Sequence, residues 1–180
     1  MDKPSDKSSD KLLDKLSDKI PDNIYVTSNN MFFEDDEKFA EKISVWNSVV
    51  RPADLVYVLG NFAVDPVSFL KVGHCLNGEK VFLIGEYDSY LHDLPSSSMF
   101  ANNPYRIINK DIILDDCKCV LSHYPYRYWH RRKDNYCNVY GYATAEVNAD
   151  DLTASACINQ KFGNKPINLN LLIEILNKKI

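Results

Sequence analysis

Three short apolar segments alternate with two segments of helical spacing in the first part of the chain. The apolar segments span residues 24–27, 55–59 and 81–84, and the segments with helical spacing span residues 34–50 and 66–76. Strands separated in this way by helices pair in parallel through crossovers, which indicates an α/β fold. Each apolar segment is followed at once by a polar loop, and such loops gather at the carboxyl edge of an open sheet. The sequence therefore predicts a candidate site at one edge of the sheet.

The helical segments carry their own boundary signals. Asp65 before Pro66 is typical of an N-cap followed by proline at the first helical position, and Asn77-Gly78 ends that helix. Asn168 can cap a last helix, and residues 112–114 and 119–122 are further strand candidates. Inward-facing helical residues are expected at Phe39, Ile43, Trp46, Val50, Leu169, Leu172, Ile173 and Leu176.

Composition excludes several classes of protein. The 180 residues are 45% hydrophobic, which fits one globular domain, and the net charge of -4 provides no basic stripe for nucleic acid. No apolar run is long enough to span a membrane, and the first residues lack the apolar centre of a signal peptide. These features predict an intracellular, cytoplasmic protein with reduced cysteines. The abundance of Asn, Lys, Asp and Tyr suggests an AT-rich genome, such as that of a virus or parasite.

Residues 1–20 differ from the rest of the chain because an Asp-Lys pair recurs every four residues. This segment is either a solvated charged tail or a short helix with Leu12, Leu16 and Ile20 on one side. The globular domain is expected over residues 21–180. Cys117 and Cys119 could be half of a zinc site, but no second ligand pair has zinc spacing, so we interpret them as two residues on the same face of a strand.

Five blocks, in unbroken order, resemble the calcineurin-like metallophosphoesterases. They are Ile24-Tyr25-Val26-Thr27-Ser28, Val56-Tyr57-Val58-Leu59-Gly60-Asn61, Ile84-Gly85-Glu86-Tyr87-Asp88, Leu121-Ser122-His123-Tyr124-Pro125 and Asn138-Val139-Tyr140-Gly141-Tyr142-Ala143-Thr144. The resemblance implies two β-sheets packed face to face and flanked by helices on both outer faces. It also implies a site for two divalent ions such as manganese, iron or zinc.

The residues at the implied ligand positions do not suit that site. The resemblance implies metal ligands at seven positions, of which only His123 is unchanged. The other six are Asn29, Met31, Asn61, Glu86, Tyr142 and Thr144, and Tyr87 replaces the histidine that assists the leaving group. Asp88 keeps the end of the third block. Glu86, Asp88 and His123 could hold one ion loosely, but one ion without a bridging carboxylate cannot clamp both the attacking and the leaving oxygen.

Other histidines do not replace the missing ones. His74 lies in an expected helix, and His92 lies beyond the third block. No shift in the alignment of this sequence with the family therefore supplies the two histidines that are missing from the fifth block. His130 has no histidine or carboxylate spaced to partner it, and we interpret it as a surface residue. It belongs to a basic, aromatic run that is either a loop packed over the cleft or an interface, with candidate interface residues Tyr126, Tyr128, Trp129, Arg131 and Arg132.

Three functions are compatible with these residues. The favoured hypothesis is a catalytically inactive, metal-free relative that works as a binding or assembly module, with a protein partner or a second copy of itself. The second is a metal-dependent phosphodiesterase or phosphatase with a degenerate site. The third is a protein that binds a small phosphorylated or nucleotide ligand without hydrolysing it, through Asn29, Asn61, His123 and Arg127.

Overall fold

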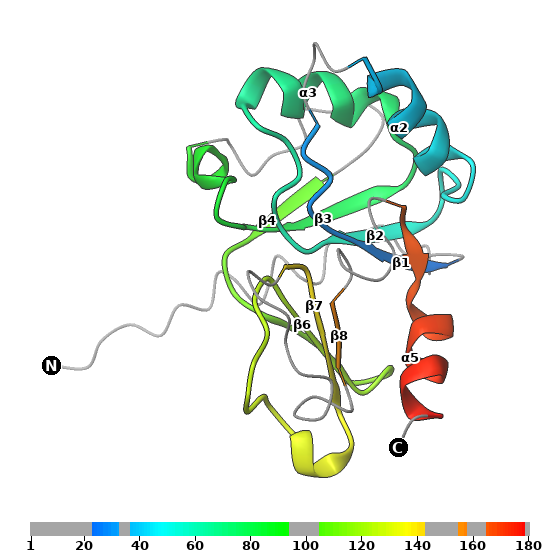
Figure 1. Ribbon diagram of the computed structural model, residues 1–180, viewed down its shortest axis with the longest axis vertical. Helices are drawn as coiled ribbons and strands as arrows, with labels where there is room; N and C mark the ends of the chain where they lie inside the picture. Colours follow the sequence, from blue (N-terminus) through cyan, green and yellow to red (C-terminus); the bar gives the residue numbers. More distant parts are fainter. Residues whose placement is uncertain (1–22, 33–36, 94–104, 143–154, 158–164, 179–180) are drawn as a thin grey trace, which may run out of the picture.

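The computed structural model describes residues 23–32, 37–93, 105–142, 155–157 and 165–178, and the following account concerns these residues. Its strands form two sheets (Figure 1). The first contains β1 (Ile24–Thr27), β2 (Leu55–Val58), β3 (Glu79–Leu83), β4 (Tyr105–Ile108) and β9 (Ile167–Asn168), in the order β4-β3-β2-β1-β9. The second contains β5 (Ile112–Leu114), β6 (Cys119–Ser122), β7 (Cys137–Tyr140) and β8 (Ser155–Cys157), in chain order. The α/β architecture expected from the sequence is therefore confirmed.

Strands β1 to β4 are parallel, and β9 adds an antiparallel edge. In the second sheet β5 is antiparallel to β6, whereas β6, β7 and β8 are parallel. The two sheets pack face to face through a shared core to which both contribute buried residues, among them Val26, Leu59, Leu121 and Val139. The carboxyl ends of the parallel strands therefore come together at one edge of the sandwich.

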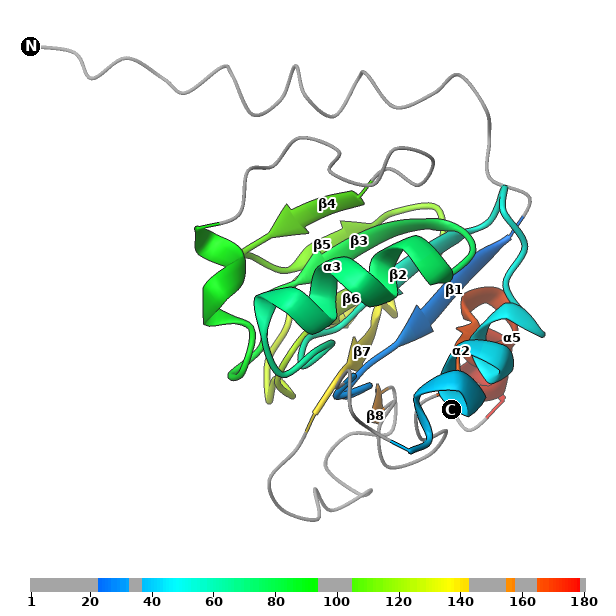
Figure 2. The ribbon, with the colours of Figure 1, turned by 90° about the horizontal axis from the view of Figure 1, so that it is seen from above.

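Helices α2 (Phe39–Asn47) and α3 (Pro66–Cys75) cover the outer face of the first sheet (Figure 2). Trp46 and Val50 are buried there as expected, while Phe39 and Ile43 are only partly buried. The predicted start of the first helix, at residue 34, lies outside the described residues, and the helix ends at Asn47 rather than at residue 50. The predicted cap is confirmed, because the Asp65 carboxylate accepts hydrogen bonds from the N–H groups of Val67 and Ser68.

Helix α5 (Leu169–Asn177) does not cover the second sheet from outside. Its buried residues Leu169, Leu172 and Leu176 join the core between the sheets, so it closes one side of the sandwich. The expectation of helices on both outer faces is wrong for the described residues. The outer face of the second sheet is instead covered by Trp129, Tyr136 and Tyr126, whose rings pack against Val120 and Tyr140.

Two short 3-10 helices, η1 (Ser89–His92) and η2 (Arg132–Asp134), complete the described structure. None of the helices in the described ranges has the length and apolar character needed to cross a membrane. Cys117 precedes strand β6 in a turn, so the expectation that it lies in the same strand as Cys119 is wrong.

A buried lysine links α3 to the first sheet. Lys80 is fully buried, and its Nζ atom donates hydrogen bonds to the carbonyl oxygens of Leu76 (2.8 Å) and Gly78 (2.6 Å). Burial lowers the pKa of Lys80 from 10.5 to about 7, and the nearby Glu79 carboxylate only partly opposes this shift. Between these two pH values the unfolded chain binds a proton at this position that the folded chain does not, so stability rises with pH.

We therefore expect Lys80→Met to remove part of the pH dependence of stability. Relative to the variant, the free energy of unfolding of the native chain should increase by about 2 kcal/mol between pH 7 and pH 9. Urea unfolding of both proteins at several pH values in this window measures the difference between their free energies of unfolding. The other titrating groups contribute equally to both proteins and therefore cancel. Parallel pH profiles would show that Lys80 is charged in the folded state at pH 9.

Candidate functional site

The loops after β1 and β2 run side by side in a strained conformation. Asn29, Met31 and Asn61 have positive φ angles of 50°, 47° and 56°, and Gly60 has φ 89°. The N–H of Asn29 donates to the carbonyl oxygen of Gly60 (2.9 Å), and that of Met31 donates to that of Asn61 (3.1 Å). Left-handed backbone outside glycine costs about 1 kcal/mol or more and is found where the surrounding structure enforces it, often at functional sites. This edge of the sheet therefore has a rigid, enforced shape.

Met31 is the misfit among these three residues. Asparagine, aspartate and histidine tolerate the left-handed region, whereas methionine has no short polar side chain to compensate it. We expect Met31→Asn to stabilise the chain by about 0.5–1 kcal/mol. Thermal unfolding measures the gain. A loss of stability would mean that packing of the Met31 side chain outweighs the backbone strain.

The amide side chains of Asn29 and Asn61 face each other. The Nδ2 atom of Asn61 lies 3.4 Å from the Oδ1 atom of Asn29, and the Asn61 Oδ1 atom accepts a hydrogen bond from the N–H of Tyr87 (3.2 Å). Asn61 is fully buried and Asn29 is partly exposed. The ends of β1 and β2 thus present two neutral amides that bind each other.

Asp88 holds the two neighbouring loops together. Its carboxylate accepts hydrogen bonds from the N–H groups of Asn61, Phe62 (3.1 Å) and Gly85 (2.9 Å). Burial raises the pKa of Asp88, and these three N–H groups and the nearby His123 oppose that rise. Both carboxylate oxygens of Asp88 therefore accept from backbone donors, and Asp88 joins the loops in this structure.

His123 connects the second sheet to the first. Its Nδ1 atom lies 2.8 Å from the carbonyl oxygen of Leu59, which can only accept, so Nδ1 carries a hydrogen. Its Nε2 atom is buried and has no hydrogen-bond partner within the described part of the chain. In either protonation state of the ring, Nε2 is thus the one histidine atom here that a ligand can engage.

Gly60, Gly85 and Gly141 make these close contacts possible. A Cβ on Gly60 would lie 2.2 Å from the Nδ1 atom of His123, and one on Gly85 would lie 2.5 Å from the Oδ1 atom of Asn61 and 2.8 Å from the Cε1 atom of His123. Because these two atoms both lie within van der Waals reach of one point, Asn61 and His123 are neighbours. The site is therefore built by backbone packing as much as by side chains.

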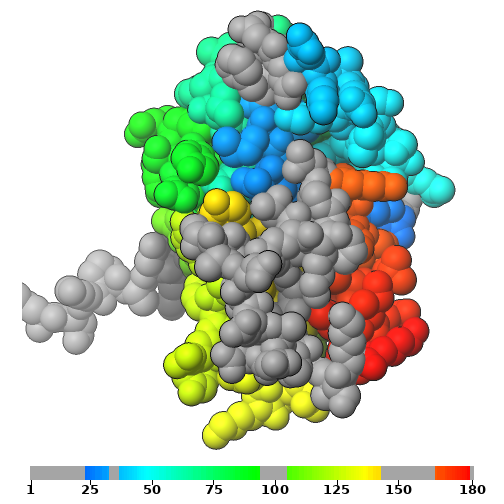
Figure 3. Space-filling model, in the orientation of Figure 1, coloured from blue at the N-terminus to red at the C-terminus, as the bar shows by residue number. Residues whose placement is uncertain are grey.

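The end of β7 meets the end of β1. The Ser28 hydroxyl donates to the carbonyl oxygen of Gly141 (2.6 Å), and the N–H of Tyr142 donates to the carbonyl oxygen of His123 (2.9 Å). In Figure 3 the blue segment after β1 lies against the gold end of β7. Ser28 and Gly141 are site residues that the sequence analysis misses. The signal that could have indicated them is a small residue placed directly after a buried strand.

Tyrosines surround His123. The Tyr124 ring contacts it edge-on at 4.4 Å between centroids, and the Tyr142 ring lies nearly parallel to it at 6.1 Å. The Tyr124 hydroxyl is 3.5 Å from the Glu86 carboxylate, and Tyr87 is half exposed. The structure therefore brings together Asn29, Asn61, Tyr87, Asp88, His123 and Tyr142, while Thr144 lies outside the described residues. Within the described part of the chain, no hydrogen bond or ion pair joins Arg127 to this group.

The pair of divalent ions that the family resemblance implies does not fit these residues. The described residues contain no group of three His, Cys, Asp or Glu side chains able to hold a metal ion. A two-ion centre concentrates about four positive charges, which bridging and terminal carboxylates normally balance. Here Asp88 is committed to backbone donors, Glu86 is exposed, and Asn29 and Asn61 carry no charge.

The candidate interface residues are mostly packed within their own loop. Trp129 is buried and donates from Nε1 to the carbonyl oxygen of Tyr136 (2.6 Å), which contradicts its expected role at an interface. Arg131 pairs with Asp115 and Asp134, and Arg132 lies over the rings of Trp129 and Tyr128. Tyr126 is partly buried and bonds Asp111, whereas Tyr128 is 79% exposed. The loop thus packs over the outer face of the second sheet.

Comparisons with known proteins give a fold likeness without a family. No protein-family model matches the chain, and no curated protein matches it. Among solved structures, the chain is similar to the crystal structure of AQ665, a protein of unknown function from Aquifex aeolicus. The TM-score is 0.59 at 17% sequence identity, covering 85% of this chain and 98% of that chain. This likeness shows that the α/β fold occurs in another protein, and it extends over nearly the whole of AQ665.

Proposed function

We propose that this chain has the calcineurin-like metallophosphoesterase fold without its two-metal chemistry, and that it acts by binding a protein partner or a second copy of itself. The observation that carries the proposal is the contact between the neutral amides of Asn29 and Asn61, 3.4 Å apart at the edge where β1 and β2 end. The resemblance puts metal-binding carboxylates at both positions. Two amides that bind each other need no ion between them.

The surrounding contacts support a protein that keeps the scaffold but does not hydrolyse phosphoesters. The Asp88 carboxylate, the Ser28 hydroxyl and the His123 imidazole each hold backbone groups of neighbouring loops in place. Such contacts stabilise the loops without involving a substrate. Tyr87 and Tyr128, both exposed, are of the residue type that most often anchors protein interfaces.

A second candidate function rests on one atom. The buried Nε2 atom of His123 lacks a partner among the described residues, and a buried polar atom left unsatisfied costs about 1–3 kcal/mol. A small ligand with a phosphate or hydroxyl group would satisfy it. The carboxylates of Asp88 and Glu86 lie on the same edge and disfavour an anion, which is why binding of a macromolecule is the first proposal.

Hydrolysis separates the first proposal from a degenerate enzyme. Purified chain is assayed against bis(p-nitrophenyl) phosphate with added manganese, beside the Asn61→Ala variant, and its metal content is determined by elemental analysis. We expect no hydrolysis above background and no stoichiometric pair of metal ions. Turnover that disappears in Asn61→Ala would overturn the proposal.

Thermal shift separates the two binding functions. Native chain and His123→Gln are heated with inorganic phosphate or nucleotides, with His130→Gln as a matched control because His130 is exposed. A ligand at a hundred times its Kd stabilises by about 2.7 kcal/mol. A shift in the native chain and His130→Gln, but not in His123→Gln, would establish the second candidate. Light scattering over a range of concentrations tests self-association.

A further inference from the structure

Two buried thiols face each other at the opposite end of the second sheet from the candidate site. Cys119 begins β6 and Cys137 begins β7, and the two residues are direct partners in the parallel register. Both are buried in the core between the sheets. Neighbouring strands are about 4.8 Å apart, which lies within the separation of about 4.4–6.8 Å between Cα atoms that a disulfide bridges.

The two thiols differ chemically. The interaction between their side chains raises the pKa of Cys119 and lowers the pKa of Cys137, and burial raises that of Cys119 further. A backbone N–H further lowers the pKa of Cys137, while burial opposes the shift. Cys137 is therefore the better nucleophile of the pair, since the thiolate is the reactive form.

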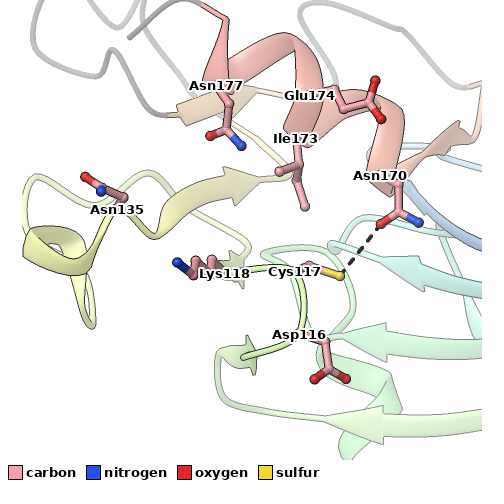
Figure 4. A pocket seen from close by; sticks show the side chains of 8 residues that line it. All are labelled: Asp116, Cys117, Lys118, Asn135, Asn170, Ile173, Glu174 and Asn177. Carbon is pink, nitrogen blue, oxygen red and sulfur yellow. Dashed lines mark hydrogen bonds between the residues drawn. The ribbon is translucent and has the colours of Figure 1, made fainter.

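A pocket lies beside the turn that leads into β6. Its volume is about 740 Å³, and it is lined by the turn before β6, the end of the η2 loop and one face of α5 (Figure 4). Lys118 and Cys117 form part of its wall. The Cys137 thiol donates a hydrogen bond to the carbonyl oxygen of Lys118 (3.7 Å), and Cys117 packs against the same core. Lys118 thus lines the pocket and also contacts Cys137.

We propose that Cys119 and Cys137 form a dithiol that hydrogen peroxide oxidises to a disulfide. The Cys137 thiolate attacks one peroxide oxygen and the O–O bond breaks, giving a sulfenic acid on Cys137 and hydroxide, which takes up a proton to become water. The Cys119 sulfur then attacks the Cys137 sulfur, the S–O bond breaks, and the departing hydroxide leaves as water with the Cys119 proton. One peroxide is reduced to two waters while two thiols become one disulfide.

Cys75 provides a matched control within the same chain. It is an exposed free thiol on α3, and its sulfur contacts the carbonyl oxygen of Lys71 (3.5 Å). In the described structure no second thiol lies beside it. Peroxide should therefore convert Cys75 to a sulfenic acid or to higher oxides but not to an intramolecular disulfide.

The test uses the full chain and graded amounts of hydrogen peroxide. After quenching, the protein is unfolded, free thiols are alkylated, and the cysteine peptides are identified by mass spectrometry. We expect a Cys119–Cys137 disulfide at peroxide levels that oxidise Cys75. The proposal is overturned if Cys119 and Cys137 remain alkylated as free thiols at those levels, or if the disulfide joins either of them to Cys117 or Cys157 instead.

Single variants test the assigned order of attack. In Cys119→Ser, the sulfenic acid on Cys137 has no resolving thiol, so dimedone should label Cys137. In Cys137→Ser, labelling of Cys119 should be at least tenfold weaker, because its thiol stays protonated. Equal labelling in the two variants would contradict the roles proposed here. The peptide mapping of the native chain remains decisive should either variant fail to fold.

Discussion

Restoring the residues that the family resemblance implies is expected to create a site for two manganese ions per chain where the native chain takes up none. The variant carries seven substitutions: Asn29→Asp, Met31→His, Asn61→Asp, Glu86→Asn, Tyr87→His, Tyr142→His and Thr144→His. The loops that carry the described positions already converge, as the contacts of Ser28 with Gly141 and of His123 with Leu59 show. Left-handed backbone at positions 29, 31 and 61 accepts aspartate and histidine.

Isothermal titration with manganese measures this effect, and circular dichroism establishes that the variant is folded. The matched control carries six of the substitutions and keeps Asn61, so it lacks the carboxylate that would bridge the ions. We expect it to bind at most one ion, because ligands of a two-ion site act as a unit. A folded sevenfold variant without manganese binding would show that the positions do not correspond to those of the family.

Gly141→Ala is expected to destabilise the chain by about 3 kcal/mol or more. A Cβ at this position would lie 2.0 Å from the carbonyl oxygen of Leu59, which is backbone and not a movable side chain end. The N–H of Gly141 also donates to the carbonyl oxygens of Ser122 and His123, and its carbonyl oxygen accepts a hydrogen bond from the Ser28 hydroxyl. The two sheets therefore cannot move apart to accommodate the added Cβ without breaking contacts at the candidate site.

Urea unfolding measures this loss, with Gly78→Ala as the comparison. Gly78 has φ 86°, and its Cβ would meet the Val50 side chain at 2.9 Å, far from the contact between the sheets. We expect Gly78→Ala to cost about 1–3 kcal/mol through backbone strain. A loss below about 1 kcal/mol in Gly141→Ala would mean that the two sheets are not held together at this point.

Local signals explain which parts of the fold could be predicted from the sequence. Strands β1 and β2 are short apolar runs, β3 contains most of the apolar run that the sequence places at residues 81–84, and the start of α3 follows from Asp65 and Pro66. Strand β3 begins two residues earlier than that run, at Glu79. Strand β7 was not assigned as a strand from its sequence. Its buried Asn138 donates to the Val120 carbonyl oxygen and the Ser122 hydroxyl. These two partners, together with the N–H of Tyr126, which donates to the Oδ1 atom of Asn138 (3.2 Å), make this polar residue acceptable in a buried position.

The candidate site was predictable in position but not in detail. Loops after parallel strands of one sheet must meet at one edge, so the neighbourhood of Asn29, Asn61 and Asp88 follows from topology. His123 follows a strand of the second sheet, and only the family resemblance placed it beside them. The role of Asp88 did not follow, because a carboxylate that binds three backbone N–H groups and one that binds an ion look alike in sequence. Burial of Trp129 likewise depends on its packing against β6 and β7. No pattern within its own segment of the sequence reveals that packing.

The pairing of β9 with β1 has a consequence for the order of folding during synthesis. Strand β1 is among the first described elements made, yet its antiparallel neighbour and helix α5 come at residues 167–177. Leu169, Leu172 and Leu176 complete the core between the sheets. A nascent chain that still has these residues inside the ribosome therefore exposes the apolar face of β1 and cannot finish its core. Chaperones that recognise exposed apolar faces can therefore bind this protein throughout the time before α5 emerges from the ribosome.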